Sequence, residues 1–114
     1  MNTAQAVPVL AALAQASRLD LFRLLVQAGP QGLAAGTLST ALQVSPSALS
    51  FHLKEMLHAG LVTATPQGRF VIYRANYAVM NALLVFLTEN CCQGADCDLG
   101  GMPPACGATA TPEP

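Results

Sequence analysis

The chain has 114 residues, of which 53% are hydrophobic and only 10% are charged, and its formal net charge is −1. This length suits one domain with one modest core, and no apolar run approaches the roughly 18 residues that a membrane-spanning helix needs. No positively charged stretch precedes an apolar one at the N-terminus, so the sequence predicts no signal peptide. We therefore expect a cytoplasmic protein without membrane contact, whose excess apolar surface is covered by association of subunits.

The charge is unevenly distributed along the chain. Residues 1–36 hold two arginines and one aspartate, residues 37–74 hold three basic residues and one glutamate, and residues 75–114 hold four acidic residues and no basic one. A surface that binds a polyanion would therefore lie in the first two thirds of the chain. With about three cations per subunit, a dimer on DNA would show a logarithmic salt slope of about −5.

Two helices are predicted before residue 30. The first, over residues 3–14, carries Val7, Leu10 and Leu13 at three-residue spacing, and Pro8 is expected to interrupt this stripe near the first turn. Ser17 and Asp20 are spaced as a capping box that opens the second helix. Gly29-Pro30 ends that helix.

The next segment predicts a loop over residues 31–36, a short helix after Thr37 and a longer helix from Ser45. Ser45-Pro46 is a serine N-cap followed by proline at the first helical position, and Gly60 is suited to close the helix after Ala59. Two stripes are expected on opposite sides of this helix. The buried stripe comprises Leu49, Leu53, Met56 and Leu57, and the outward stripe comprises Ser47, Ser50, Phe51 and Lys54.

A β-hairpin and a final helix complete the predicted elements. Residues 61–65 and 69–74 alternate in polarity and flank the turn residues Pro66-Gln67-Gly68. Residues 77–88 are free of charge and apolar around most of the helix, so this helix should be buried on more than one face. The expected fold is mainly α with a β-hairpin, arranged as a winged helix-turn-helix.

In such a fold the second helix of the pair enters the major groove and the hairpin reaches a neighbouring phosphate or the minor groove. Serine and lysine on the outward stripe can bind bases or phosphates, and an exposed Phe51 has no structural purpose there. The alternative is an ordinary helical domain whose polar stripe faces water. His52 and His58 are expected to be partly buried or phosphate-binding rather than metal ligands. The predicted DNA-binding residues are Ser45, Ser47, Ala48, Ser50, Phe51, His52, Lys54, Gln67 and Arg69.

Residues 45–54, 59–62 and 68–73, read together, resemble the ArsR/SmtB family of metal-responsive repressors. The resemblance covers about residues 8–90 and implies a homodimer held by the first and last helices, bound to palindromic double-stranded operator DNA and released by an inducer. It divides the chain into a DNA-binding and dimerisation domain over residues 1–90 and a largely irregular tail over residues 91–114. Phe51 stands where the family usually has a basic or polar residue.

All four cysteines lie in or beside this tail, at Cys91, Cys92, Cys97 and Cys106. Thiolates prefer thiophilic metals and metalloids, and a cytoplasmic chain keeps them reduced. The family's other inducer sites have no counterpart here, since residues 33–37 hold no sulfur and the final helix holds no Asp/His pair. The chain is similar to arsenical repressors whose final helix ends in a vicinal cysteine pair with a third cysteine beyond.

Ligand number favours trivalent arsenic or antimony, which bonds three sulfurs, over structural zinc, which prefers four ligands. We expect As(III) to bind Cys91, Cys92 and Cys97 as an inducer, with no cofactor in the DNA-bound state. Adjacent helical side chains diverge by about 100°, so the helix must unwind near Asn90 or Gly94. A methylated arsenical on Cys91 and Cys92, a zinc, cadmium or thiol-redox sensor, and a non-regulatory thiol carrier are the alternatives. No nucleophile with a base at recognisable spacing suggests an enzyme.

Overall fold

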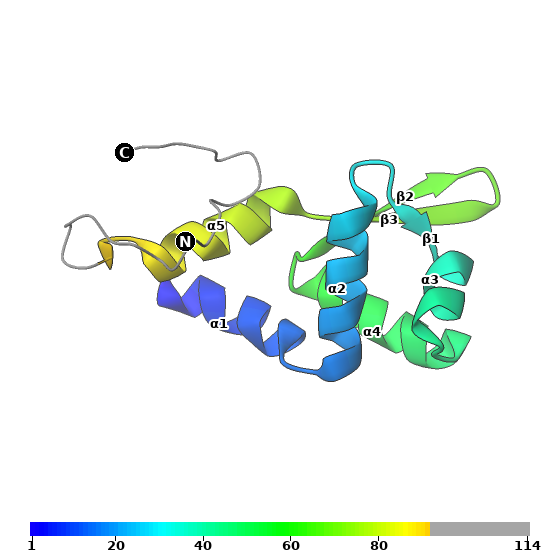
Figure 1. Ribbon diagram of the computed structural model, residues 1–114, viewed down its shortest axis with the longest axis horizontal. Coiled ribbons are helices and arrows are strands. Elements are labelled where there is room, and N and C mark those ends of the chain that lie inside the picture. Colours follow the sequence, from blue (N-terminus) through cyan, green and yellow to red (C-terminus); the bar gives the residue numbers. More distant parts are fainter. Residues whose placement is uncertain (92–114) are drawn as a thin grey trace.

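The computed structural model describes residues 1–91. Its elements are α1 (Thr3–Leu13), α2 (Ala16–Ala28), β1 (Leu33–Ala34), α3 (Ala35–Leu42), α4 (Pro46–His58), β2 (Val62–Gln67), β3 (Phe70–Ala75) and α5 (Tyr77–Thr88). Figure 1 shows α1 and α5 at one end of the protomer and the β2–β3 wing at the other, with α2 between them. The predicted winged helix-turn-helix is confirmed. Within residues 1–91, no helix combines the length and the apolar character that a bilayer crossing requires.

The first two helices begin at side-chain caps that differ from the predicted one. The Asn2 side chain accepts a hydrogen bond from the Gln5 N–H (2.8 Å), and Gln5 Oε1 accepts one from the Asn2 N–H (2.9 Å). Gln15 Oε1 accepts from the Arg18 N–H (2.8 Å) and caps α2. The predicted capping box at Ser17 is therefore wrong, because α2 has already begun at Ala16. The expected break at the proline of α1 is also wrong, since the helix continues through it to Leu13.

Helix α4 has the ends that its sequence predicts. Ser45 Oγ accepts a hydrogen bond from the Ala48 N–H (3.1 Å), and Pro46 occupies the first turn. After the helix, Gly60 adopts a φ of +80°. The Gly60 N–H donates to the Leu57 carbonyl (3.0 Å) and the Leu61 N–H to the Met56 carbonyl (2.9 Å), which is the Schellman pattern of a glycine-terminated helix.

The wing belongs to a three-stranded antiparallel sheet of order β1-β3-β2. Residues 31–36 were expected to form a loop, but Leu33 pairs with Tyr73 and Ala34 with Ile72. The hairpin turn is also shifted from its predicted place. Pro66 pairs with Val71 inside the sheet, and the two turn residues are Gly68, at a φ of +61°, and Arg69. Glycine at the first turn position is typical of a type II′ turn.

Gly32 directly precedes β1 and lies so close to β3 that there is no room for a side chain. Its φ is +68°, and a Cβ atom there would lie 2.5 Å from the Tyr73 carbonyl oxygen. Gly32→Ala should lower the free energy of unfolding by about 3 kcal/mol, because positive φ and a backbone collision add. Gly29→Ala is the matched control, since Gly29 has a φ of +82° but nothing within 4 Å of its Cβ position, and about 1 kcal/mol is expected. Equal melting temperatures for the two variants would contradict this account of the sheet.

The core is formed by one cluster to which all five helices and the sheet contribute. Its buried side chains are Ala6, Val9, Ala12, Leu21, Phe22, Leu25, Leu38, Leu49, Leu53, Met56, Leu61, Val62, Ala75 and Leu83. One predicted feature of this core is wrong: Leu57 is 38% exposed, because it lies about 80° around the helix from Leu49. In α1 the buried residues are Ala6, Val9 and Ala12 while Val7 and Leu10 are exposed, and in α5 only Leu83 is buried within the protomer.

Candidate nucleic-acid interface

The turn between α3 and α4 is fixed by Ser39 and Gln43. Ser39 Oγ donates to the Val44 carbonyl (2.6 Å), and the Val44 N–H donates to the Ser39 carbonyl (3.2 Å). Gln43 ends α3 in the left-handed conformation with a φ of +56°. These bonds hold α4 at a defined angle to α3, which is the geometry that places a second helix in a major groove. The left-handed Gln43 was not anticipated, since glutamine gives no strong signal for that conformation.

The outward stripe of α4 is exposed as predicted, at Ser47, Ser50, Phe51 and Lys54. The opposite side of the helix is anchored in the core by Leu49, Leu53 and Met56. A rigid helix therefore presents two hydroxyls, one ammonium group and one phenyl ring to the surroundings.

The other predicted contact residues of α4 have additional structural roles. Ser45 Oγ accepts the capping hydrogen bond and lies 3.3 Å from Ser47 Oγ. Ala48 is half-buried. His52 is also half-buried; its Nδ1 atom is buried and has no hydrogen-bond partner among the residues that the structure describes. The rings of Phe51 and His52 meet edge to face, with centroids 5.9 Å apart and an interplanar angle of 64°.

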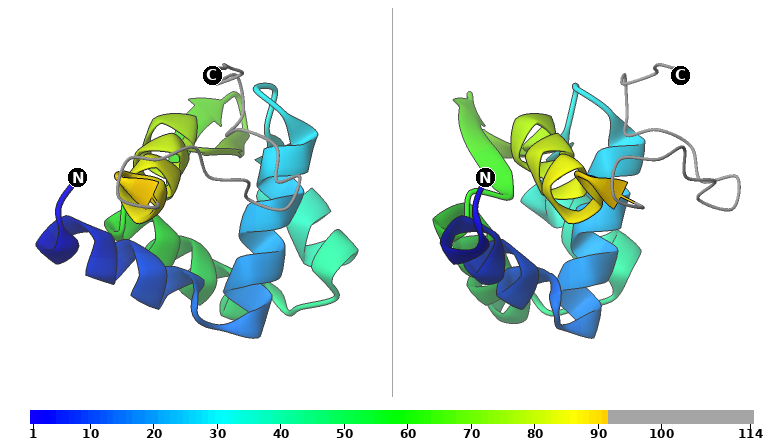
Figure 2. Two further views of the ribbon diagram at one scale, coloured as in Figure 1. Left: turned by 60° about the vertical axis from the view of Figure 1, so that its left-hand side comes forward. Right: turned by 90° about the vertical axis from the view of Figure 1, so that its left-hand side faces the viewer.

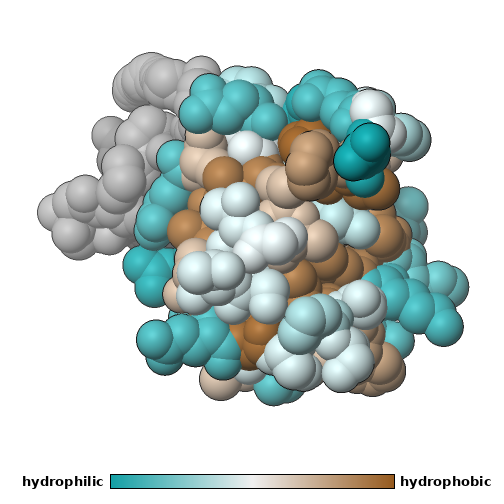
Figure 3. Space-filling model, turned by 90° about the vertical axis from the view of Figure 1, so that its right-hand side faces the viewer, coloured by the Kyte–Doolittle hydropathy of each residue, from teal (hydrophilic) through white to brown (hydrophobic). Residues whose placement is uncertain are grey.

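The wing presents Gln67 and Arg69 to solvent at its tip, as predicted. Beside them Phe70 is 65% exposed. Arg74 lies at the base of the wing, where its Nε–H donates to the Pro30 carbonyl (2.7 Å). Figure 3 views the wing end of the molecule and shows apolar surface in its middle with hydrophilic side chains around it.

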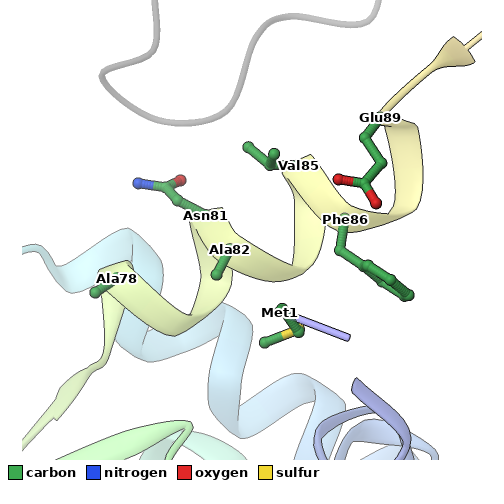
Figure 4. A pocket seen from close by; sticks show the side chains of 7 residues that line it. All are labelled: Met1, Ala78, Asn81, Ala82, Val85, Phe86 and Glu89. Atoms are coloured by element: carbon green, nitrogen blue, oxygen red, sulfur yellow. The ribbon is translucent and has the colours of Figure 1, made fainter. Parts of the chain in front are cut away.

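The opposite end carries exposed apolar side chains on α1 and α5. Val7 and Leu10 of α1 are 56% and 40% exposed. Val85 and Leu87 of α5 are 58% and 56% exposed and project from nearly opposite sides of that helix. The side of α5 is hollowed by a pocket of about 360 Å³, and in Figure 4 Asn81, Val85 and Phe86 project from α5 while Met1 lies beside the helix. In the right-hand view of Figure 2, α1 and α5 both face the viewer. A monomer would leave these side chains exposed to water.

The chain leaves regular helix before it reaches the first cysteine. Helix α5 ends at Thr88, whose Oγ1 donates to the Leu84 carbonyl (2.8 Å). Glu89 is extended and Asn90 is left-handed, with a φ of +58°. The expectation that the helix unwinds near Asn90 is confirmed, and Cys91, which is partly exposed, follows this break.

The predicted inducer site can be placed only in part. Cys92, Cys97 and Cys106 lie outside the described residues. Within residues 1–91, no three or more His, Cys, Asp or Glu side chains gather in a way that could hold a metal ion. His58 is exposed and lines a hollow beside α1 together with Glu55 and Arg18.

Known proteins share this fold over most of the chain. A helix-turn-helix domain family matches residues 13–64. The transcriptional activator HlyU of Vibrio cholerae serotype O1 (strain ATCC 39315 / El Tor Inaba N16961) is 34% identical over 92 residues, which are 81% of this chain and 82% of that protein. An ArsR-like transcriptional regulator from Rhodococcus sp. RHA1 is 33% identical, with a TM-score of 0.66 over 74% of this chain and 76% of that one.

A third relative is the homodimeric winged helix-turn-helix DNA-binding domain Mb0332 of Mycobacterium bovis. It is 26% identical, with a TM-score of 0.60 over 82% of this chain and 87% of that one. These relatives are transcription regulators or DNA-binding domains rather than enzymes. The present chain belongs to the ArsR family of winged helix-turn-helix transcriptional regulators.

Proposed function

We propose that this regulator is a cytoplasmic homodimeric repressor that trivalent arsenic or antimony releases from its operator. Helix α4 would enter the major groove with the predicted residues Ser45, Ser47, Ala48, Ser50, Phe51, His52 and Lys54, and Gln67 and Arg69 of the wing would reach the adjacent backbone. The exposed, rigidly anchored stripe of α4 supports this proposal. Lys54 and Arg69 are the cations placed to reach DNA phosphates, whereas Arg74, also positively charged, directs its Nε–H to the Pro30 carbonyl at the base of the wing.

The dimer is supported by the exposed apolar side chains on α1 and α5 and by the homodimeric M. bovis relative. Pairing this end of two protomers across a twofold axis would cover Val7, Leu10 and Val85, which are exposed in the protomer over residues 1–91. A twofold dimer carries two copies of α4, and two equal half-sites about one helical turn apart would match them. The expected operator is therefore palindromic.

The single observation that carries the inducer site is the unwound backbone between α5 and Cys91. Because Cys91 follows a break in the helix, the cysteine pair need not continue the geometry of α5, and Cys97 lies five residues beyond Cys92 in the sequence. We infer that Cys91, Cys92 and Cys97 supply the three thiolates that trivalent arsenic prefers. Binding would draw Cys97 toward Cys91 and Cys92 at the end of α5, next to the proposed dimer interface, and would change the distance between the two copies of α4.

Footprinting tests the regulatory part of the proposal. The purified chain should protect two half-sites in a duplex selected from random sequence, whereas a thiol metal carrier would protect no defined sequence. The V. cholerae relative is named an activator, so the sign of regulation needs its own measurement. A reporter placed behind the selected operator should be silent in the presence of the protein and active after arsenite is added; a reporter that requires the protein for activity would refute repression.

Salt dependence tests the two proposed cations. With Lys54 and Arg69 from both subunits on phosphates, the logarithmic slope of affinity against salt should be about −3.6, and Lys54→Ala should make it shallower by about 1.8 while weakening all duplexes similarly. Lys54→Arg is the control, since it keeps the charge and should keep the slope. An unchanged slope in Lys54→Ala, measured by fluorescence anisotropy between 50 and 200 mM salt, would remove Lys54 from the interface.

A further inference from the structure

The phenyl ring of Phe51 is an apolar group on an otherwise polar face. Its side chain is 56% exposed, and its neighbours on the outward stripe are Ser47, Ser50 and Lys54. The other exposed large apolar residue of α4, Leu57, lies about 120° away around the helix. A surface that docks another protein usually presents several contiguous apolar side chains. A lone phenyl ring between serines and a lysine instead fits a partner that is polar and anionic with isolated apolar groups.

The ring already has an aromatic neighbour before any partner binds. It makes an edge-to-face contact with the half-buried His52, on a helix that is anchored in the core through Leu53. A phenyl side chain has few rotatable bonds, so it loses little conformational entropy when a partner immobilises it. Phe51 is therefore suited to recognition rather than to loose surface coverage.

The proposed partner is duplex DNA, and its major groove offers one apolar group on the base edges. In the major groove, guanine, cytosine and adenine present hydrogen-bond donors and acceptors, while thymine adds a C5-methyl group. A phenyl ring can satisfy neither donors nor acceptors, but it gains free energy by burying a methyl group. We propose that Phe51 packs on a thymine methyl group in each operator half-site and so determines the base at that position. This inference rests on the proposed function, because it requires α4 to lie in the major groove.

The test compares thymidine with deoxyuridine, which pairs with adenine in the same way and lacks only the C5-methyl group. A duplex selected from random sequence by the full chain is synthesised with deoxyuridine at each thymidine in turn. At one thymidine in each half-site, the substitution should weaken binding roughly fourfold, and about fifteenfold when both half-sites are changed. Phe51→Ala should bind the thymidine duplex and the deoxyuridine-substituted duplex with equal affinity.

The matched control is Phe70→Ala, which removes the other strongly exposed phenylalanine, at the wing. It should keep the full thymidine preference. Both variants remove an exposed side chain, and equal thermal melting of all three proteins confirms that the fold is intact.

The inference is wrong if the parent chain binds the selected operator equally tightly with thymidine or deoxyuridine at every position. It is also wrong if Phe51→Ala keeps the preference for thymidine. Either result would leave the proposed function standing. Failure to select any duplex would overturn both.

Discussion

The Cys91→Ser protein is expected to remain on its operator at arsenite concentrations that release the parent chain. A serine hydroxyl is close in size to a thiol but is a hard, protonated oxygen ligand, so the trivalent ion would lose one of three strong bonds. In the parent chain, coupling of about 1–3 kcal/mol between the ion and DNA sites would lower DNA affinity 5–150-fold; in the variant this factor should be close to one. Without arsenite both proteins should bind the operator equally, because Cys91 lies beyond α5 and at a distance in sequence from α4 and the wing.

Other cysteine variants distinguish the inducers. Cys92→Ser should behave like Cys91→Ser, and Cys106→Ser serves as the control that still responds. Cys97→Ser should lose the response to arsenite but keep it for a methylated arsenical, which has bonds for only two thiolates. A Cys91→Ser protein that arsenite still releases would exclude the proposed site. Release by an oxidant alone would favour a thiol-redox sensor, and release by zinc or cadmium alone would favour a metal sensor.

Replacing Val85 with glutamate is expected to convert the dimer into monomers. Val85 is 58% exposed on α5 and lines the pocket beside Met1, so in the proposed dimer two added carboxylates would be buried near the twofold axis without partners. Burying unpaired charges of this kind should raise the dimer dissociation constant by roughly a thousandfold. Operator affinity should fall by a similar order, since each monomer would hold one half-site alone.

Leu19→Glu is the matched control for this change. Leu19 is 45% exposed on α2, and the variant adds the same charge to an exposed apolar position on another helix. It should sediment as a dimer and bind the operator with nearly unchanged affinity. If Val85→Glu also sediments as a dimer with full affinity, the subunits meet through some other face.

The elements that the sequence predicted well are those determined by neighbours in the chain. The serine, proline and glycine around α4 determine its ends through contacts no more than five residues apart, and the outward stripe follows from helical spacing. The sequence likewise predicts the unwinding near Asn90, because asparagine tolerates a positive φ better than most residues.

The elements that were missed depend on distant partners. Strand β1 is two residues long and exists because Leu33 meets Tyr73, 40 positions along the chain, which no local pattern indicates. The buried side of α1 is formed by Ala6, Val9 and Ala12, whereas Val7 and Leu10 on the same helix are exposed. Those exposed residues have no explanation in a monomer, and they are explained by the proposed dimer.

The most direct test of the proposed mechanism is a titration of the preformed operator complex of the parent chain, under reducing conditions, with arsenite, antimonite, zinc and a methylated trivalent arsenical, followed by fluorescence anisotropy. Arsenite and antimonite should release the DNA at concentrations near one equivalent per subunit, and zinc should not. A complex that stays intact through excess arsenite, or one that zinc dissociates as readily, would contradict the account.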